Sequence, residues 1–157
     1  SQIHHLRHYL DRIVPPHAPA VVVFYSGDND LAGVCGPTHN ATQVLDAYRA
    51  LLKQTRAALP NAALAVISIK PSLSRAALWP ESMRANQALE ALVAQLDDTH
   101  WIDLSTPLLD PATGAARPEL YRRDGLHLNE RGYGIWTKHL SGALQSIYQG
   151  SAPASVG

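Results

Sequence analysis

The stretch Val21-Val22-Val23-Phe24-Tyr25 decides the fold, because it is a continuous run of β-branched and aromatic residues with the length of a strand. A run without polar alternation is typical of a parallel strand that helices cover on both faces. Upstream, apolar residues recur at helical spacing over residues 2–14, and Pro15-Pro16 ends that pattern. We therefore expect a helix followed by a strand at the centre of a parallel sheet.

Helices and strands alternate after this run. The predicted elements are a helix over 41–58 that Asn40 caps, a strand over 63–69, a helix that begins near Pro80, a strand over 99–103 and a helix over 129–149. This order implies right-handed crossovers and an α/β protein with helices on both faces of a parallel sheet. Because an exposed apolar edge favours aggregation, we also expect a further strand beside residues 21–25 that this chain does not supply.

Composition limits the domain organisation and the partners. The chain has 157 residues, which fits one domain, and we place this domain at 1–149 with a flexible tail at 150–157. The 13 Lys and Arg residues balance 13 Asp and Glu residues, so no nucleic-acid partner is expected. No apolar stretch reaches the about 20 residues of a transmembrane helix. Cys35 is the single cysteine, and it leaves the cellular compartment open.

One helical stripe has the spacing of metal ligands. His4, His8 and Asp11 fall at positions i, i+4 and i+7 of the helix expected over 2–14. They lie largely opposite the apolar face of that helix, so a solvated polar face is the favoured interpretation. We predict no metal site.

Two short polar motifs lie in the loops that follow the predicted strands. Ligands of open parallel sheets bind beyond the carboxyl ends of the strands, where we expect loops over 26–40, 70–80 and 104–128. The motif Gly27-Asp28-Asn29-Asp30 lies in the first loop, and Asp124-Gly125-Leu126-His127 lies in the third. We therefore predict that the two motifs converge at one edge of the sheet.

Each motif has a catalytic interpretation and an ordinary one. Asp124 can fold back and accept a hydrogen bond from Nδ1 of His127, which leaves Nε2 of the ring as a base. Asn29 offers an amide donor to an oxyanion, and Gly27 permits a tight turn. Taken singly, such motifs are more often polar surface turns. Their order in the chain, with an α/β pattern between them, favours the catalytic interpretation.

The two motifs together resemble those of the SGNH hydrolases, the GDSL-like lipases and esterases, over about residues 1–149. Gly27-x-Asn29-Asp30 is similar to the family block whose Asn donates to the oxyanion, and Asp124-x-x-His127 is similar to the block that supplies the acid and base of a Ser-His-Asp triad. The resemblance implies a three-layer α/β/α sandwich of flavodoxin-like type. It also implies serine ester hydrolysis without a metal or another cofactor.

The chain departs from the family pattern at the nucleophile, because Gly-Asp-Ser occurs nowhere in it. The resemblance implies that the nucleophilic serine lies upstream of residue 1, together with a glycine donor and the N-terminal strand or strands. Ser26 and Ser1 are less favoured, since a nucleophile needs a hydrogen bond to His127 as well as proximity. We therefore expect the full-length parent to be a carboxylic ester hydrolase and this chain alone to be inactive.

Substrate contacts are expected at Gly27 and, in the second loop, at Arg75 and Trp79. The segment around Arg75 and Trp79 is similar to the middle of some small bacterial members of the family. The expected partner is a small-molecule, lipid or sugar ester, and the upstream segment is a further partner if it is a separate chain. The alternative is a catalytically inactive hydrolase-like module that binds a ligand or a partner through the same crevice.

Overall fold

The structure, a computed structural model, describes Ile3, residues 19–34 and residues 36–151. The helix expected over 2–14 lies outside the described residues except for Ile3, and so do Cys35, the polar stripe of His4, His8 and Asp11, and residues 152–157. Ile3 is fully buried in the largest of the core clusters, which also contains Phe24 and Tyr48.

A parallel sheet forms the middle layer. Its strands are β1 (Val21–Phe24), β2 (Ala63–Ile67) and β3 (Thr99–Ile102), in the order β1-β2-β3. Val21 pairs with Ala63, and Leu64 pairs with Thr99. Each strand begins where the sequence predicts, β1 and β3 end one residue before their predicted limits, and β2 ends two residues before its limit.

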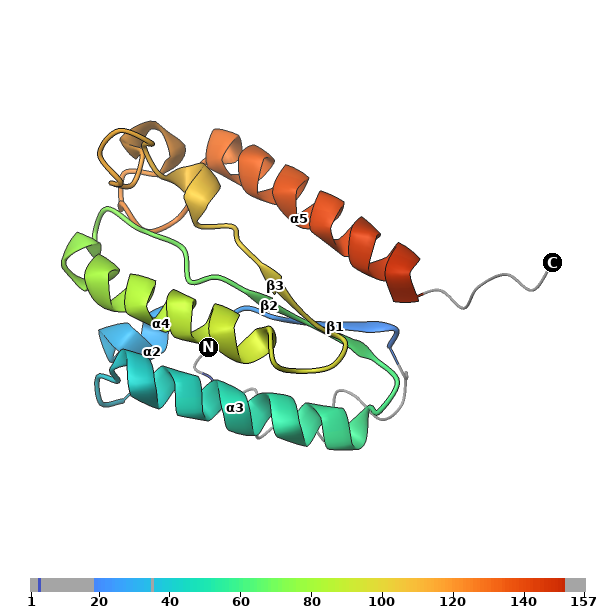
Figure 1. The fold of residues 1–157 in the computed structure, drawn as a ribbon. Coiled ribbons are helices and arrows are strands. Elements are labelled where there is room, and N and C mark those ends of the chain that lie inside the picture. The colour runs from blue at the N-terminus through green and yellow to red at the C-terminus, as the bar shows by residue number, and fades with distance from the viewer. Residues whose placement is uncertain (1–2, 4–18, 35, 152–157) are drawn as a thin grey trace.

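Helices cover both faces of the sheet (Figure 1). Helices α3 (Ala41–Ala58) and α4 (Trp79–Val93) lie on one face, and α5 (Glu130–Ser151) lies on the other. This arrangement confirms the predicted three-layer α/β/α fold. Helix α5 continues two residues beyond the predicted limit.

Among the three described strands β2 lies in the middle and β1 at one edge, whereas the apolar run favours a central position for β1. All five residues of β2 are buried, because Leu64 and Val66 pack on the side of α3 and α4 while its other residues pack on the side of α5. In β1, Phe24 is buried but Val23 is 39% exposed. Since β1 pairs only with β2 among the described residues, its second edge has no strand there. The further strand expected beside β1 stays a prediction.

Local signals set the helix ends. The side chain of Asn40 accepts from the backbone N–H of Gln43, and the side chain of Gln43 accepts from the N–H of Asn40, so α3 begins with a capping box. Asn129 accepts from the N–H of Gly132 at the start of α5. The predicted limits of α3 are therefore correct, and α5 begins one residue later than predicted.

A short helix α2 (Asp28–Ala32) lies at the first motif, where the sequence predicts a loop with a tight turn. Two carboxylates lie in its first turn, where they favour the helix N-terminus, and Leu31 is buried. The remaining helical elements are short 3₁₀ turns: η1 (Ala76–Leu78), η2 (Thr106–Leu108) and η3 (Pro118–Leu120).

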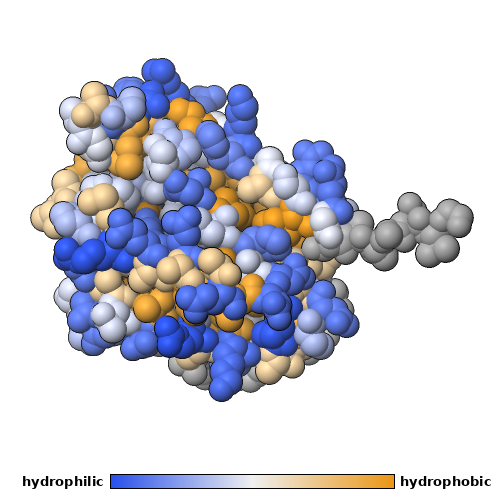
Figure 2. Space-filling model, in the orientation of Figure 1, coloured by the Kyte–Doolittle hydropathy of each residue, from blue (hydrophilic) through white to orange (hydrophobic). Residues whose placement is uncertain are grey.

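The face formed by α3 and α4 is mostly hydrophilic, with apolar side chains scattered between the polar ones (Figure 2). Such a face is typical of helices whose apolar stripe is turned to the sheet. Among the helices in the described ranges, none has the length and apolarity to cross a membrane.

Gly132 and Gly134 in α5 are expected to respond in opposite directions to replacement with alanine. A Cβ on buried Gly132 would lie 2.3 Å from the backbone oxygen of Leu120, whereas a Cβ on Gly134 would meet nothing within 4 Å. Gly132→Ala should therefore lower the free energy of unfolding by about 1–3 kcal/mol, and Gly134→Ala should raise it by about 1 kcal/mol, since alanine favours a helix. Urea unfolding measures both. Equal effects at the two positions would contradict the packing of α5 on the loop before it.

Candidate active site

The loops that follow β1, β2 and β3 lie at the same end of the molecule (Figure 1). This placement follows from the parallel sheet, because the carboxyl ends of all its strands point the same way. Both polar motifs are therefore at one edge of the sheet, as expected from the sequence.

The Asp124-to-His127 motif forms a tight turn. The N–H of Arg122 donates to the carbonyl oxygen of His127 at 2.8 Å, and the N–H of Gly125 donates to that of Arg122 at 2.9 Å. Tyr121 and Leu128 pair as an antiparallel bridge at its base. The turn thus has a fixed backbone conformation just before α5.

Both oxygens of Asp124 are engaged within this turn. Oδ2 lies 2.7 Å from Nδ1 of His127, and Oδ1 accepts from the backbone N–H groups of Leu126 and His127 at 2.9 and 3.0 Å. These hydrogen bonds, led by the one from the His127 ring, hold the pKa of Asp124 well below its usual value. An ionised Asp124 favours the tautomer with the proton on Nδ1. The His127 side chain is 59% exposed.

Asn29 lies in the first turn of α2, as the second residue after the N-cap Gly27. Gly27 has a φ of 124°, and a Cβ on it would lie 2.9 Å from Cδ1 of Ile69. Asp30 is buried, and both its carboxylate oxygens accept from the N–H of Ile3 at 3.3 Å. Glycine at position 27 therefore allows the close contact between α2 and the loop after β2.

The loop after β2 connects the two motifs. The N–H of Ser74 donates to the carbonyl oxygen of Gly125 at 3.0 Å, while the guanidinium of the next residue, Arg75, donates to Oδ1 of Asn29. Gly125 has a φ of 64°, and a Cβ on it would lie 3.1 Å from the Cβ of Leu73. Neighbouring residues of one loop thus contact both polar motifs, the one with Asn29 and the one with His127.

Lys70 and Tyr121 strengthen this connection. Nζ of Lys70 donates to the carbonyl oxygen of Leu126 at 2.7 Å and lies 5.8 Å from the centre of the Tyr121 ring. Burial lowers the pKa of Lys70 and raises that of Tyr121 to about 12. The hydroxyl of Tyr121 donates to the carbonyl oxygen of Pro71 at 2.7 Å.

Asn86 fixes the beginning of the same loop. Its side-chain amide accepts from the N–H of Ile69 at 2.8 Å and donates to the carbonyl oxygen of Ile69 at 3.0 Å. Tyr48 acts similarly after β1, because its hydroxyl bonds both the N–H and the carbonyl oxygen of Ser26. Periodicity places Tyr48 on the apolar face of α3, but it does not reveal this polar role.

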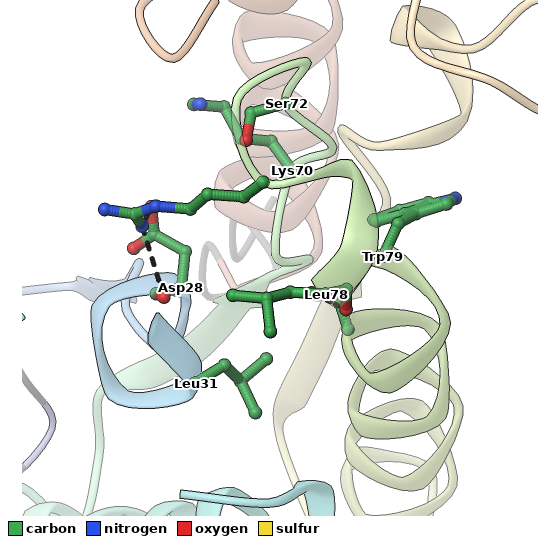
Figure 3. Close-up of a pocket in the computed structure, with 8 residues that line it drawn as sticks. Asp28, Leu31, Lys70, Ser72, Leu78 and Trp79 are labelled. Carbon is green, nitrogen blue, oxygen red and sulfur yellow. Dashed lines mark hydrogen bonds and ion pairs between the residues drawn. The ribbon is translucent and has the colours of Figure 1, made fainter. Parts of the chain in front are cut away.

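The residues predicted to contact substrate lie in different surroundings. Trp79, together with Asp28 and Lys70, borders a cavity of about 10 Å³ (Figure 3). This volume is room for one water molecule at most. Arg75 also borders it, and its guanidinium is paired with the carboxylate of Asp28 at 3.2 Å. Gly27 is buried beside Ile69. Their contacts with substrate stay predictions.

Trp79 also borders a larger, mostly apolar hollow. It has a volume of about 480 Å³, and Leu73, Met83 and Ala116 are among its lining residues. Within the described part of the chain, no three His, Cys, Asp or Glu side chains are grouped as a metal site. Ser26, the weaker nucleophile candidate, is 4% exposed.

Solved structures share this fold. A family 3 carbohydrate esterase from Talaromyces cellulolyticus is 22% identical with a TM-score of 0.75, covering 95% of this chain and 69% of that one. A mutant acetyl esterase solved with an acetate ion is 22% identical with a TM-score of 0.77, covering 97% of this chain and 70% of that one. A GDSL-like lipase from Bacteroides thetaiotaomicron is 18% identical with a TM-score of 0.74, covering 93% of this chain and 72% of that one.

The sequence was also compared with curated proteins and with protein families. The search of curated proteins gave no match. The model of the GDSL-like lipase and acylhydrolase family matches residues 2–135, a range that contains both polar motifs. The chain therefore belongs to the GDSL-like lipase and acylhydrolase family of hydrolases.

Proposed function

We propose that the full-length protein is a serine ester hydrolase in which His127 is the general base, Asp124 orients it and Asn29 donates to the oxyanion. The observation that carries this proposal is the 2.7 Å contact between Asp124 Oδ2 and His127 Nδ1 in a turn whose backbone also binds the carboxylate. This arrangement places a proton on Nδ1 and leaves Nε2, on the opposite edge of the ring, to accept one.

The reaction begins at a serine upstream of residue 1. Its hydroxyl oxygen attacks the ester carbonyl carbon while His127 Nε2 takes the hydroxyl proton. The carbonyl oxygen becomes an oxyanion, to which the amide of Asn29 donates a hydrogen bond. Collapse of this intermediate expels the alcohol, which receives the proton from His127. A water molecule then attacks the acyl carbonyl while His127 Nε2 takes its proton, the carboxylic acid is released, and the serine oxygen takes the proton back from His127.

The substrate is an ester of a small molecule, a lipid or a sugar. Carbohydrate and acetyl esterases among the structures with this fold support short acyl groups as the first ones to assay. The apolar hollow beside Trp79 offers space for a less polar part of the substrate. The upstream segment is a partner of this chain if the two are separate polypeptides.

A fluorophosphonate probe tests the proposal, because it reacts with an activated serine. The full-length protein should be labelled at a serine upstream of residue 1, and the chain of residues 1–157 alone should not be labelled. Mass spectrometry of the labelled peptide locates the serine. Labelling of Ser26, or of the 157-residue chain at the same rate as the full-length protein, would contradict the upstream nucleophile. Absence of labelling in the full-length protein would instead favour the inactive binding module.

A further inference from the structure

Arg75 contacts the side chain expected to stabilise the oxyanion. Its Nη1 and Nη2 lie 3.2 and 3.1 Å from Oδ1 of Asn29, and Nη1 lies 3.2 Å from both the carbonyl oxygen and Oδ2 of Asp28. The Arg75 side chain is 19% exposed. The guanidinium is thus held against the first turn of α2 by several hydrogen bonds.

These contacts define which way the amide of Asn29 points. A guanidinium has only donors, so the atom of Asn29 that faces it must be the oxygen, and the NH₂ group must lie on the other branch of the amide. An amide turned by 180° would present its oxygen where an oxyanion forms, and two oxygens with negative charge would then repel each other. The two-point contact of Arg75 therefore selects the rotamer in which Asn29 can donate.

The charge of Arg75 is balanced locally. Oδ2 of Asp28 forms an ion pair with Nη1 at 3.2 Å, so the guanidinium and this carboxylate carry no net charge together. Arg75 is suited to fix geometry at Asn29 more than to supply positive charge to the reaction. The N–H of the preceding residue, Ser74, donates a hydrogen bond to Gly125 in the turn that carries His127. This hydrogen bond fixes the position of Arg75 relative to both motifs.

We propose that Arg75 is a positioning residue, which holds the amide of Asn29 with its NH₂ group turned toward the reacting carbonyl group. The proposal rests on the proposed function, because it concerns the same oxyanion. It differs from a direct contact between Arg75 and substrate in one respect. If Arg75 acts through Asn29, its removal has no further effect once the amide of Asn29 is gone.

A double-mutant cycle in the full-length protein tests this dependence with p-nitrophenyl acetate as the probe substrate. Asn29→Ala should lower kcat about 100 to 1000-fold, and Arg75→Met, which removes the donors but keeps much of the side chain, should lower kcat about 10 to 100-fold with little change in KM. The double variant should have the kcat of Asn29→Ala within about twofold, because residues that act through one another are not additive.

Two further variants keep the test decisive. Arg75→Lys retains the charge but not the planar two-point donor, so its kcat should fall and its effect should also vanish in the Asn29→Ala background. It replaces Arg75→Met if that variant fails to fold in a thermal-unfolding measurement. Arg84→Met is the matched control, since Arg84 is an exposed residue of α4 that pairs with Glu81. Its kcat should be that of the unmodified protein.

Two results would overturn different parts of the assignment. If the losses from Arg75 and Asn29 multiply, Arg75 does not act through Asn29 and the positioning role is wrong, while the hydrolase function stands. If Asn29→Ala alone keeps the original kcat, Asn29 is not the oxyanion donor, and the proposed function fails at that residue.

Discussion

Replacing His127 with alanine in the full-length protein is expected to lower kcat for p-nitrophenyl acetate about 10⁴-fold, because in the proposed mechanism the nucleophile and the leaving alcohol both exchange their proton with this ring. The fold should be unaffected, since the His127 side chain is 59% exposed. KM should change much less than kcat, because the ring transfers a proton in the transition state and contributes little to substrate binding in the ground state. Steady-state kinetics measures both constants, and thermal unfolding checks the fold.

The described structure offers a matched histidine as the control. His100 in β3 also faces a nearby carboxylate, with Nε2 3.1 Å from Oδ1 of Asp98, and its side chain is 38% exposed. It lies near the amino end of β3, whereas the loops with the two motifs follow the carboxyl ends of the strands. His100→Ala should therefore leave kcat unchanged. Normal esterase activity of His127→Ala would refute the acid-base assignment.

Replacing Asp124 with asparagine is expected to have a comparable effect, a fall in kcat of about 10⁴-fold. The backbone N–H groups of Leu126 and His127 both point at Oδ1, so they will retain the oxygen of an asparagine at that place. The NH₂ group of the asparagine must then face Nδ1 of His127. Because it is a donor, it forces Nδ1 to accept and moves the ring proton to Nε2. The ring can then no longer take the proton of the serine.

This prediction separates orientation from mere proximity, because Asp124→Asn keeps the size of the side chain and its backbone contacts. Nitrogen-15 NMR of the His127 ring identifies the tautomer directly, and the proton should be found on Nδ1 in the original protein and on Nε2 in the variant. Asp98→Asn, next to His100, is the control and should not alter kcat. An Asp124→Asn variant with full activity, or with the proton still on Nδ1, would show that Asp124 does not select the tautomer.

The ionisation of Asp124 also determines the pH range in which it can orient the ring of His127. Its pKa is lowered, first by the hydrogen bond from His127 and then by the backbone N–H groups. A carboxyl group with a lowered folded-state pKa contributes stability that is present above its usual pKa and is lost only as the pH falls through the lowered value. Asp124 therefore stays ionised in mildly acid solution and continues to orient the ring there.

The sequence predicts those parts of the fold that depend on neighbouring residues. The capping box of Asn40 and Gln43 and the proline after α3 set the limits of that helix, and both signals are local. The contact of Asp124 with His127 is also local, because a turn of four residues suffices to form it. The order of strands and helices adds that the two motifs share one edge of the sheet, since a parallel sheet brings its loops to the same end.

Position within the sheet is not a local property. The apolar run of β1 suggests a central strand, yet β2 is the strand buried on both faces, because burial depends on which strands and helices lie beside it. Helix α2 is missed for a related reason. Its signals are carboxylates in the first turn and a glycine cap, which also fit a polar turn, and the burial of Leu31 distinguishes the two.

The sequence by itself thus determined the α/β/α class, the limits of α3 and the residues of both polar motifs. Only the tertiary structure decided that β2 is the middle one of the described strands and that Arg75, 46 positions after Asn29, binds its amide oxygen. The physical reason is that hydrogen-bond geometry within a turn is fixed by a few backbone angles. A contact between the loops after β1 and β2 instead depends on how all the layers pack together.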